Sequence, residues 1–178
     1  MMYQIGEKVV YPMHGVGVVQ NIEEKDILGK KRKYYIMELS HTNMTVMVPV
    51  DMSTKIGLRG VVSIDEISKA FGVLSSIPTE LEDDWKIRYS NNHTKVKNGS
   101  FLELAEVVRN LFKRNQVKEL SNSEKKLFEN ALNLMIDEIA LTKEIEKIEV
   151  EHMITETLEK NLFKDKKEKE ELETKSIR

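Results

Sequence analysis

Residues 8–22 read KVVYPMHGVGVVQNI, and this stretch indicates how the chain begins to fold. Two β-branched runs flank a short segment that carries Pro12 and Gly15. Valine favours extended backbone, whereas proline ends a strand and glycine permits a sharp bend or bulge. Gly15 and Gly17 sit where a small, strongly curved sheet needs such bends. The stretch therefore predicts two short strands of an antiparallel sheet.

Further strand signals follow on the C-terminal side of this stretch. Residues 33–39 (KYYIMEL) are aromatic and β-branched, and residues 44–48 (MTVMV) end at Pro49. The polar connections between these runs are short, and SHTN at residues 40–43 is typical of a hairpin turn. Four or five short strands within residues 1–60 predict a small antiparallel β-barrel.

From residue 63 onward the pattern becomes helical. Apolar residues recur at i, i+3, i+4 and i+7, as in residues 101–112. Four predicted helices begin at capping residues. These are Ser63 with Glu66, Asp83 or Asp84, Ser100 with Glu103, and Ser121 with Glu124. Gly99 is a natural C-terminal stop. We therefore predict an α+β chain of two domains: a β-barrel (1–60), a linker helix and loop (61–80), a compact all-helical domain (81–162) and a charged, frayed tail (163–178).

Composition excludes several functional classes. The chain of 178 residues has no cysteine, so it has no disulfide, thiolate nucleophile or cysteine zinc site. Its four histidines are dispersed without metal-ligand spacing, and no phosphate-binding loop or nucleophile motif is present. The N-terminus lacks a signal-peptide pattern, and no apolar run approaches the ~20 residues of a membrane span. We predict a cytoplasmic, monomeric, non-enzymatic protein without cofactor, metal or membrane contact.

The charges are unevenly distributed although the net charge is only −2. Residues 86–126 contain ten Lys or Arg against four Asp or Glu, whereas residues 127–178 contain nine against fourteen. Such asymmetry indicates a basic face for a polyanion, although a charge run is also typical of a solvated helix surface. The basic segment opens at Trp85, the only tryptophan of the chain.

Trp85 is open to two interpretations. A flat ring among cations is what a protein uses to stack on a base or to enter a DNA groove. The alternative is a tryptophan at a helix start that packs half-buried against its own domain or anchors a protein interface. A general single-strand binder would carry more aromatic residues than Trp85 and Tyr89 in its basic segment.

Several stretches together resemble a known family. The N-terminal stretches VVYPMHGVGVV (9–19), ILGKKRKYYIMEL (27–39) and MTVMVPV (44–50) resemble the N-terminal domain of CarD-type bacterial transcription regulators, the CarD/CdnL family. The same domain occurs in the transcription-repair coupling factor, whose helicase motifs are absent here. DDWKIRYSNNHTKVKNG (83–99), LAEVVRNLF (104–112) and LSNSEKKLFENA (120–131) resemble the helical C-terminal domain of that family. The resemblance runs from about residue 3 to residue 141.

The resemblance implies a fold and a function. The family's N-terminal domain is a Tudor-like barrel that docks on the β subunit of bacterial RNA polymerase. Its helical domain contacts promoter DNA at the upstream edge of the transcription bubble, where a tryptophan at the position of Trp85 wedges into the minor groove. The implied function is stabilisation of the promoter open complex with little sequence specificity. The alternative is a protein-interaction module that has the same two domains but no DNA wedge.

The resemblance also implies which residues make the contacts. Arg88 and Lys125 match positions that contact or approach the DNA backbone. Lys25 stands where the family often has arginine at the polymerase interface, Met47 replaces an arginine of some members, and Ser90 replaces a basic residue. The predicted DNA-contacting residues are Trp85, Lys86, Arg88, Tyr89, Arg114 and Lys125. The predicted polymerase-contacting residues are Lys25, Ile27 and Met47.

Overall fold

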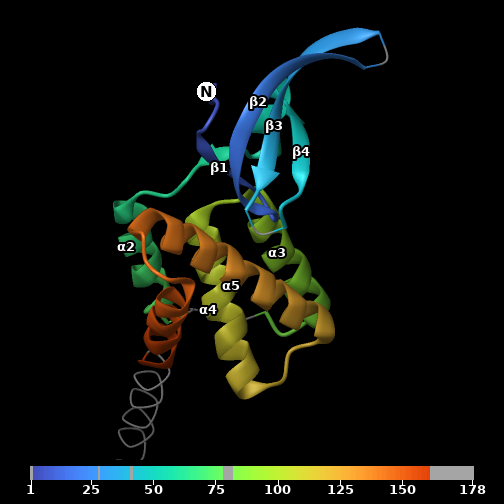
Figure 1. The fold of residues 1–178 in the computed structure, drawn as a ribbon. Coiled ribbons are helices and arrows are strands. Elements are labelled where there is room, and N and C mark those ends of the chain that lie inside the picture. The colour runs from blue at the N-terminus through green and yellow to red at the C-terminus, as the bar shows by residue number, and fades with distance from the viewer. Residues whose placement is uncertain (1, 28, 41, 78–81, 161–178) are drawn as a thin grey trace, which may run out of the picture.

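The protein consists of an antiparallel sheet followed by a helical bundle (Figure 1). The computed structural model describes residues 2–27, 29–40, 42–77 and 82–160. The predicted tail at residues 163–178 and part of the predicted loop before residue 82 lie outside the described residues. No helix of the described part of the chain is both long enough and apolar enough to cross a membrane.

The described part of the sheet has five strands. They are β1 (Lys8–Tyr11), β2 (Gly15–Ile27), β3 (Lys30–Leu39), β4 (Thr45–Pro49) and β5 (Arg59–Gly60). Their order is β4-β3-β2-β1-β5, and all neighbours are antiparallel, which confirms the predicted antiparallel sheet. The sheet is open, because β4 and β5 are its two edges and do not pair with each other. Barrel closure is therefore absent from the described strands, since the two-residue β5 reaches only β1.

One face of the sheet carries the core of this module. Tyr35, Met37 and Val48 are almost completely buried, as strand alternation places them on the same side. Tyr3 covers one end of this core, and its hydroxyl donates to the Leu58 carbonyl oxygen at 2.9 Å. A 3-10 turn, η1 (Val50–Met52), and the single helical turn α1 (Ser53–Ile56) connect β4 to β5.

The helical module begins at α2 (Ile64–Leu74) and continues with α3 (Trp85–Asn98), α4 (Phe101–Val117) and α5 (Asn122–Lys143). Residues 147–160 form a further helix. The predicted capping boxes at Ser63 and Ser121 are confirmed, and Ser100 accepts from the Glu103 N–H as predicted. Asp84 is the residue that caps α3.

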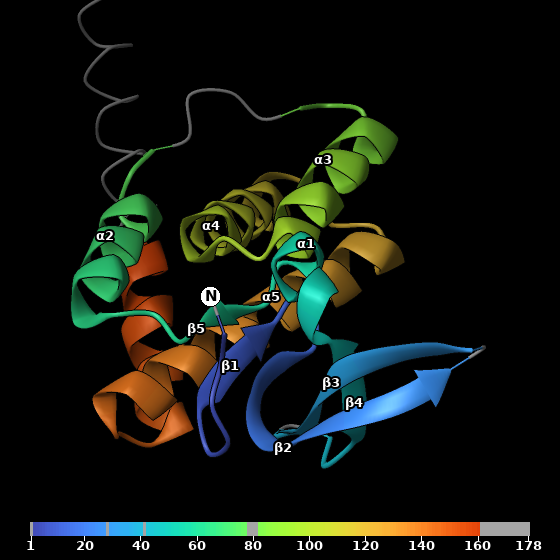
Figure 2. The same cartoon turned by 90° about the horizontal axis from the view of Figure 1, so that it is seen from above.

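The segment predicted to be a linker belongs, by its packing, to the helical module. Ile67, Ala70 and Leu74 of α2 are buried in one core with α4 and α5. In the last helix, Ile154 and Leu158 reach the same core. Figure 2 shows α5 running between the sheet on one side and α4 on the other, so that this helix contacts both modules.

The junction between the modules is built on a buried carboxylate. Glu138 of α5 is 1% exposed and receives two hydrogen bonds from the Arg59 guanidinium of β5, at 2.5 and 2.9 Å. Its Oε1 also accepts the Val62 N–H at 2.9 Å. Arg59 Nε donates in turn to the Gly99 carbonyl oxygen at 2.6 Å. One ion pair thus connects the sheet, the start of the helical module and the turn after α3.

Gly99 offers a direct test of this junction. Its φ is +76°, and a Cβ atom added there would lie 2.8 Å from Pro12 Cγ. We expect Gly99→Ala to lower the free energy of unfolding by about 1–3 kcal/mol, because left-handed backbone and a steric clash coincide. Gly72→Ala in α2 is the matched control, because its Cβ would meet nothing within 4 Å. Denaturant unfolding should show the control as stable as wild type or more so; equal losses in both variants would contradict the clash.

Candidate nucleic-acid interface

Trp85 is the first residue of α3 and lies at the surface. Its side chain is 47% exposed, so the ring is neither buried in the core nor fully in solvent. Asp84 fixes the start of the helix because its carboxylate accepts the N–H groups of Lys86 and Ile87. The Lys86 ammonium lies 6.0 Å from the ring centroid of Trp85. The ring is therefore presented at a defined helix end beside a cation.

A buried ion pair one turn along α3 supports this position. Arg88 is 6% exposed, and its Nε donates to Glu124 Oε1 of α5 at 2.7 Å. Its Nη1 donates to the carbonyl oxygens of Glu82 and Asp83, the residues that lead into the helix. The same guanidinium thus holds the approach to Trp85 and the start of α5. Arg88 lies beneath the surface and fixes the segment that leads into the helix start at Trp85.

Glu124 serves two elements at once. Its Oε2 accepts the Ser121 N–H and hydroxyl, which completes the capping box of α5, while its Oε1 binds Arg88. Burial alone would raise the pKa of the Glu124 carboxyl, but the hydrogen bonds from Arg88 and Ser121 outweigh it and lower the pKa below its ordinary value. Glu124 therefore stays ionised at neutral pH and holds α3 and α5 together.

A depression of about 250 Å³ opens beside the Trp85 ring. It is lined by Asp83, Trp85, Arg88, Arg114, Lys118, Glu119, Leu120, Ser121 and Glu124. Arg114 at its rim pairs with Asp83 at 3.2 Å, and Lys125 at the start of α5 pairs with Glu119. The hydrogen bond from Lys125 lowers the pKa of Glu119. The Trp85 ring, four cations (Arg88, Arg114, Lys118 and Lys125) and the exposed carboxylates of Asp83 and Glu119 thus lie within one region.

The predicted DNA-contacting residues therefore fall into two groups. Trp85, Lys86 and Lys125 lie at the surface, and the mostly covered Arg114 side chain reaches this region through its pair with the exposed Asp83. Arg88 is buried, and Tyr89 stacks on His93 with 5.7 Å between the ring centroids and packs against the helical core. Sequence reasoning did not find the pairing roles of three acidic residues. Their partners lie elsewhere along the chain: 31 residues away for Asp83, 6 for Glu119 and 36 for Glu124.

The predicted polymerase-contacting residues share one face of the sheet. Lys25 is opposite Arg32, Ile27 is opposite Lys30, and Met47 is opposite Ile36. Directly opposite residues point to the same side, and even-numbered positions of β3 share a face. This face is the one opposite to the buried Tyr35 and Met37. Ile27 is 41% and Met47 50% exposed, while Lys25 pairs with Glu23 at 3.1 Å.

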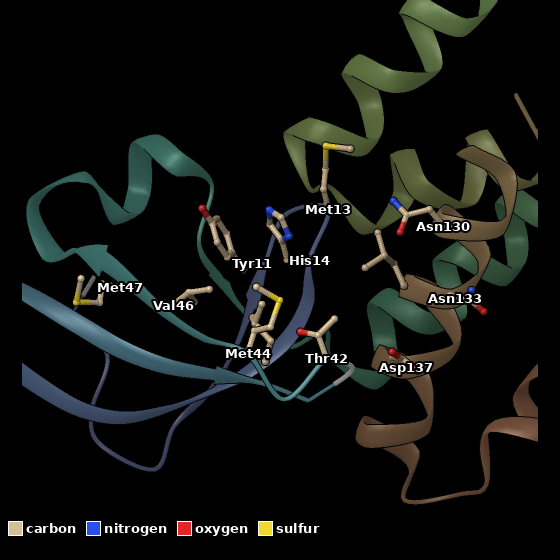
Figure 3. A pocket seen from close by; sticks show the side chains of 12 residues that line it. Tyr11, Met13, His14, Thr42, Met44, Val46, Met47, Asn130, Asn133 and Asp137 are labelled. Atoms are coloured by element: carbon tan, nitrogen blue, oxygen red, sulfur yellow. The ribbon is translucent and has the colours of Figure 1, made fainter. Parts of the chain in front are cut away.

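A second hollow lies between β4 and α5 (Figure 3). It has a volume of about 560 Å³ and is lined by Tyr11, Met13, His14, Leu39, Thr42, Met44, Val46, Met47, Asn130, Asn133, Leu134 and Asp137. His14 lies against the Tyr11 ring at a centroid distance of 4.7 Å. Within the described residues, no group of three His, Cys, Asp or Glu side chains is arranged to hold a metal ion. Met44 and Met47 line this hollow and are exposed, and flexible methionine side chains make it an adaptable contact surface.

Comparisons with known proteins match both modules in order. Residues 3–62 match the family model described as "CarD-like/TRCF RID domain", and residues 69–155 match "CarD, C-terminal domain". The chain is 39% identical over 144 residues to a protein of Bacillus subtilis (strain 168) named "Putative transcription factor YdeB". That alignment covers 81% of this chain and 94% of the relative. The chain therefore belongs to the CarD/CdnL family of transcription regulators.

Proposed function

We propose that this protein docks on the β subunit of RNA polymerase through its sheet and stabilises the promoter open complex through Trp85. Membership of the family indicates a role in transcription regulation. The match of residues 3–62 to the RID model supports RNA polymerase as the partner. The observation that carries the DNA contact is the half-exposed Trp85 ring, which lies on a buried support among surface cations.

The buried ion pair near the start of α3 suits a wedge. An apolar ring that enters a base step must not retreat into its own protein, and the buried Arg88–Glu124 pair holds the helix end in place. Inserting the ring costs little where the duplex is already opening, and the contact exists only in the open form. A factor that binds the open state more tightly shifts the equilibrium by that difference in affinity. No base-specific contact is required, so promoters of different sequence can respond.

The sheet suits docking on another protein. Lys25, Ile27 and Met47 share the face away from the module's core, and Met47 lies on β4, an edge of the sheet. Edge strands offer unpaired backbone groups to a strand of a partner. Docking then raises the local concentration of the helical module at the promoter, so that weak DNA contacts suffice.

The function is tested by the lifetime of promoter open complexes, measured with the cognate polymerase in the presence and absence of the protein. We expect a longer lifetime with the protein at concentrations that saturate the polymerase. An unchanged lifetime under saturation would exclude open-complex stabilisation and favour a protein-interaction module.

The docking surface is tested by reversing the charge of Lys25. We expect Lys25→Glu to weaken polymerase binding about tenfold, because a like charge replaces an attraction at the interface. Lys69→Glu on α2 is the matched control, since Lys69 is a surface lysine of the other module that pairs with Asp65. Equal affinities of both variants, measured by titration of labelled protein with polymerase, would place the docking surface elsewhere.

A further inference from the structure

Two cations near Trp85 are already paired in the free protein: the Lys125 side chain is 42% exposed, and the Arg114 side chain, at 13%, is mostly covered. Arg114 Nη1 lies 3.2 Å from Asp83 Oδ1, and Lys125 Nζ binds Glu119 Oε1. The two carboxylates are unusually open to solvent, because the Asp83 side chain is 92% and the Glu119 side chain 80% exposed. Both reach inward from the rim to a cation that contributes to the proposed DNA face.

Ion pairs whose carboxylate is exposed to solvent are easily exchanged, and the Lys125–Glu119 pair, exposed on both sides, is the more open of the two. Such pairs contribute little to stability because water screens them and because two side chains must be held in one geometry. Carboxylate and phosphate oxygens accept from guanidinium and ammonium groups in the same way, so a phosphate can take the position of a carboxylate. By contrast, Arg88 and Glu124 are buried and have further partners, so an incoming anion cannot reach them as readily.

We propose that Asp83 and Glu119 are specificity-determining residues of the DNA face, which hold Arg114 and Lys125 until backbone phosphates replace them. The inference rests on the proposed function, because it takes the face around Trp85 as the DNA contact. DNA on its own must displace two carboxylates and therefore binds weakly. DNA beside a docked polymerase is present at high local concentration and displaces them readily. The two carboxylates weaken both contacts by the same factor, so free DNA is left largely unbound while promoter DNA held at high local concentration by the polymerase stays bound.

The test is binding of the full chain to a labelled promoter fork, a duplex with one unpaired end, at fixed low salt and without polymerase. We expect Asp83→Asn and Glu119→Gln each to tighten binding about two- to fivefold, as the loss of an exposed ion pair predicts. Glu129→Gln is the matched control, since Glu129 lies on α5 one turn beyond Lys125 and the change removes the same charge. The control should change the affinity less than twofold.

A double-mutant cycle separates exchange at one cation from a general change in charge. In a Lys125→Met background, Glu119→Gln should no longer tighten binding, because the lysine it releases is absent. An equal gain with and without Lys125, or gains no larger than that of Glu129→Gln, would overturn the proposal.

The same series separates failure of this inference from failure of the proposed function. If Lys125→Met weakens fork binding but Glu119→Gln and Asp83→Asn have no effect, the DNA face stands and only the exchange is wrong. If Lys125→Met, Trp85→Ala and both neutralised carboxylates all bind as wild type does, the DNA face itself lies elsewhere and both proposals fail.

Discussion

Trp85→Ala is expected to remove most of the gain in open-complex lifetime while leaving polymerase affinity nearly unchanged. Stacking of a base on an aromatic side chain contributes about 1–3 kcal/mol, so the lifetime should fall between about fivefold and about 150-fold towards the value without the protein. Polymerase affinity should persist because Trp85 belongs to α3, whereas the proposed docking residues lie on the sheet. The lifetime is measured after addition of a competitor that traps free polymerase.

Ile87→Ala provides the control for this expectation. Ile87 lies two residues further along α3 and is 50% exposed, so the substitution removes a similar exposed apolar group from the same helix. It should retain the lifetime of wild type. If Trp85→Ala and Ile87→Ala give the same open-complex lifetime, the Trp85 ring does not act as a wedge. Trp85 would then contact another protein or pack against its own domain.

Glu124→Ala is expected to lower the free energy of unfolding by about 3–5 kcal/mol, which is the usual loss when one partner of a buried ion pair is removed. The substitution leaves the guanidinium of Arg88 buried without its counter-charge, and it removes one half of the capping box at Ser121. Denaturant unfolding measures the loss. Glu129→Ala on the same helix is the control, because Glu129 is exposed. A loss below about 1 kcal/mol would show that the Arg88 guanidinium is not left buried without compensation in the variant.

The Glu124 carboxyl also predicts a dependence on pH. Its pKa is lowered in the folded state, so folding favours the ionised form. The resulting stability is present above the ordinary glutamate pKa of about 4.3 and is lost as the pH falls through the lower folded value. We expect wild type to lose more stability than Glu124→Gln when unfolding is compared at neutral pH and below about pH 4. Parallel losses in the two proteins would contradict this.

The order and type of the elements follow from local patterns. Ser63 and Ser121 each have a glutamate three residues later, and both cap their helices as predicted. A helix start depends on neighbouring backbone groups, so a short window of sequence contains the information. The strands are predicted for the same reason, because alternation and turn residues are local features.

The features that the sequence does not reveal depend on distant partners. Arg88 looks like one more cation of a basic segment, yet its carboxylate partner lies 36 residues away on another helix. Whether a barrel closes depends on β5, whose two residues carry no strand signal in the sequence. Likewise, only tertiary packing shows that α2 joins the helical core, because an amphipathic helix in a linker has the same pattern.

The length of α5 has a consequence for the proposed contact with DNA. Glu138, which fixes the sheet, and Glu124, which fixes the Trp85 end, are 14 residues apart on this helix. They are about 21 Å apart along its axis, so a tilt of about 10° at the sheet would displace the far end by about 4 Å. Successive base pairs are separated by about 3.4 Å. In the proposed DNA complex, the stiffness of the Arg59–Glu138 junction would therefore decide whether the Trp85 ring meets one base step or its neighbour.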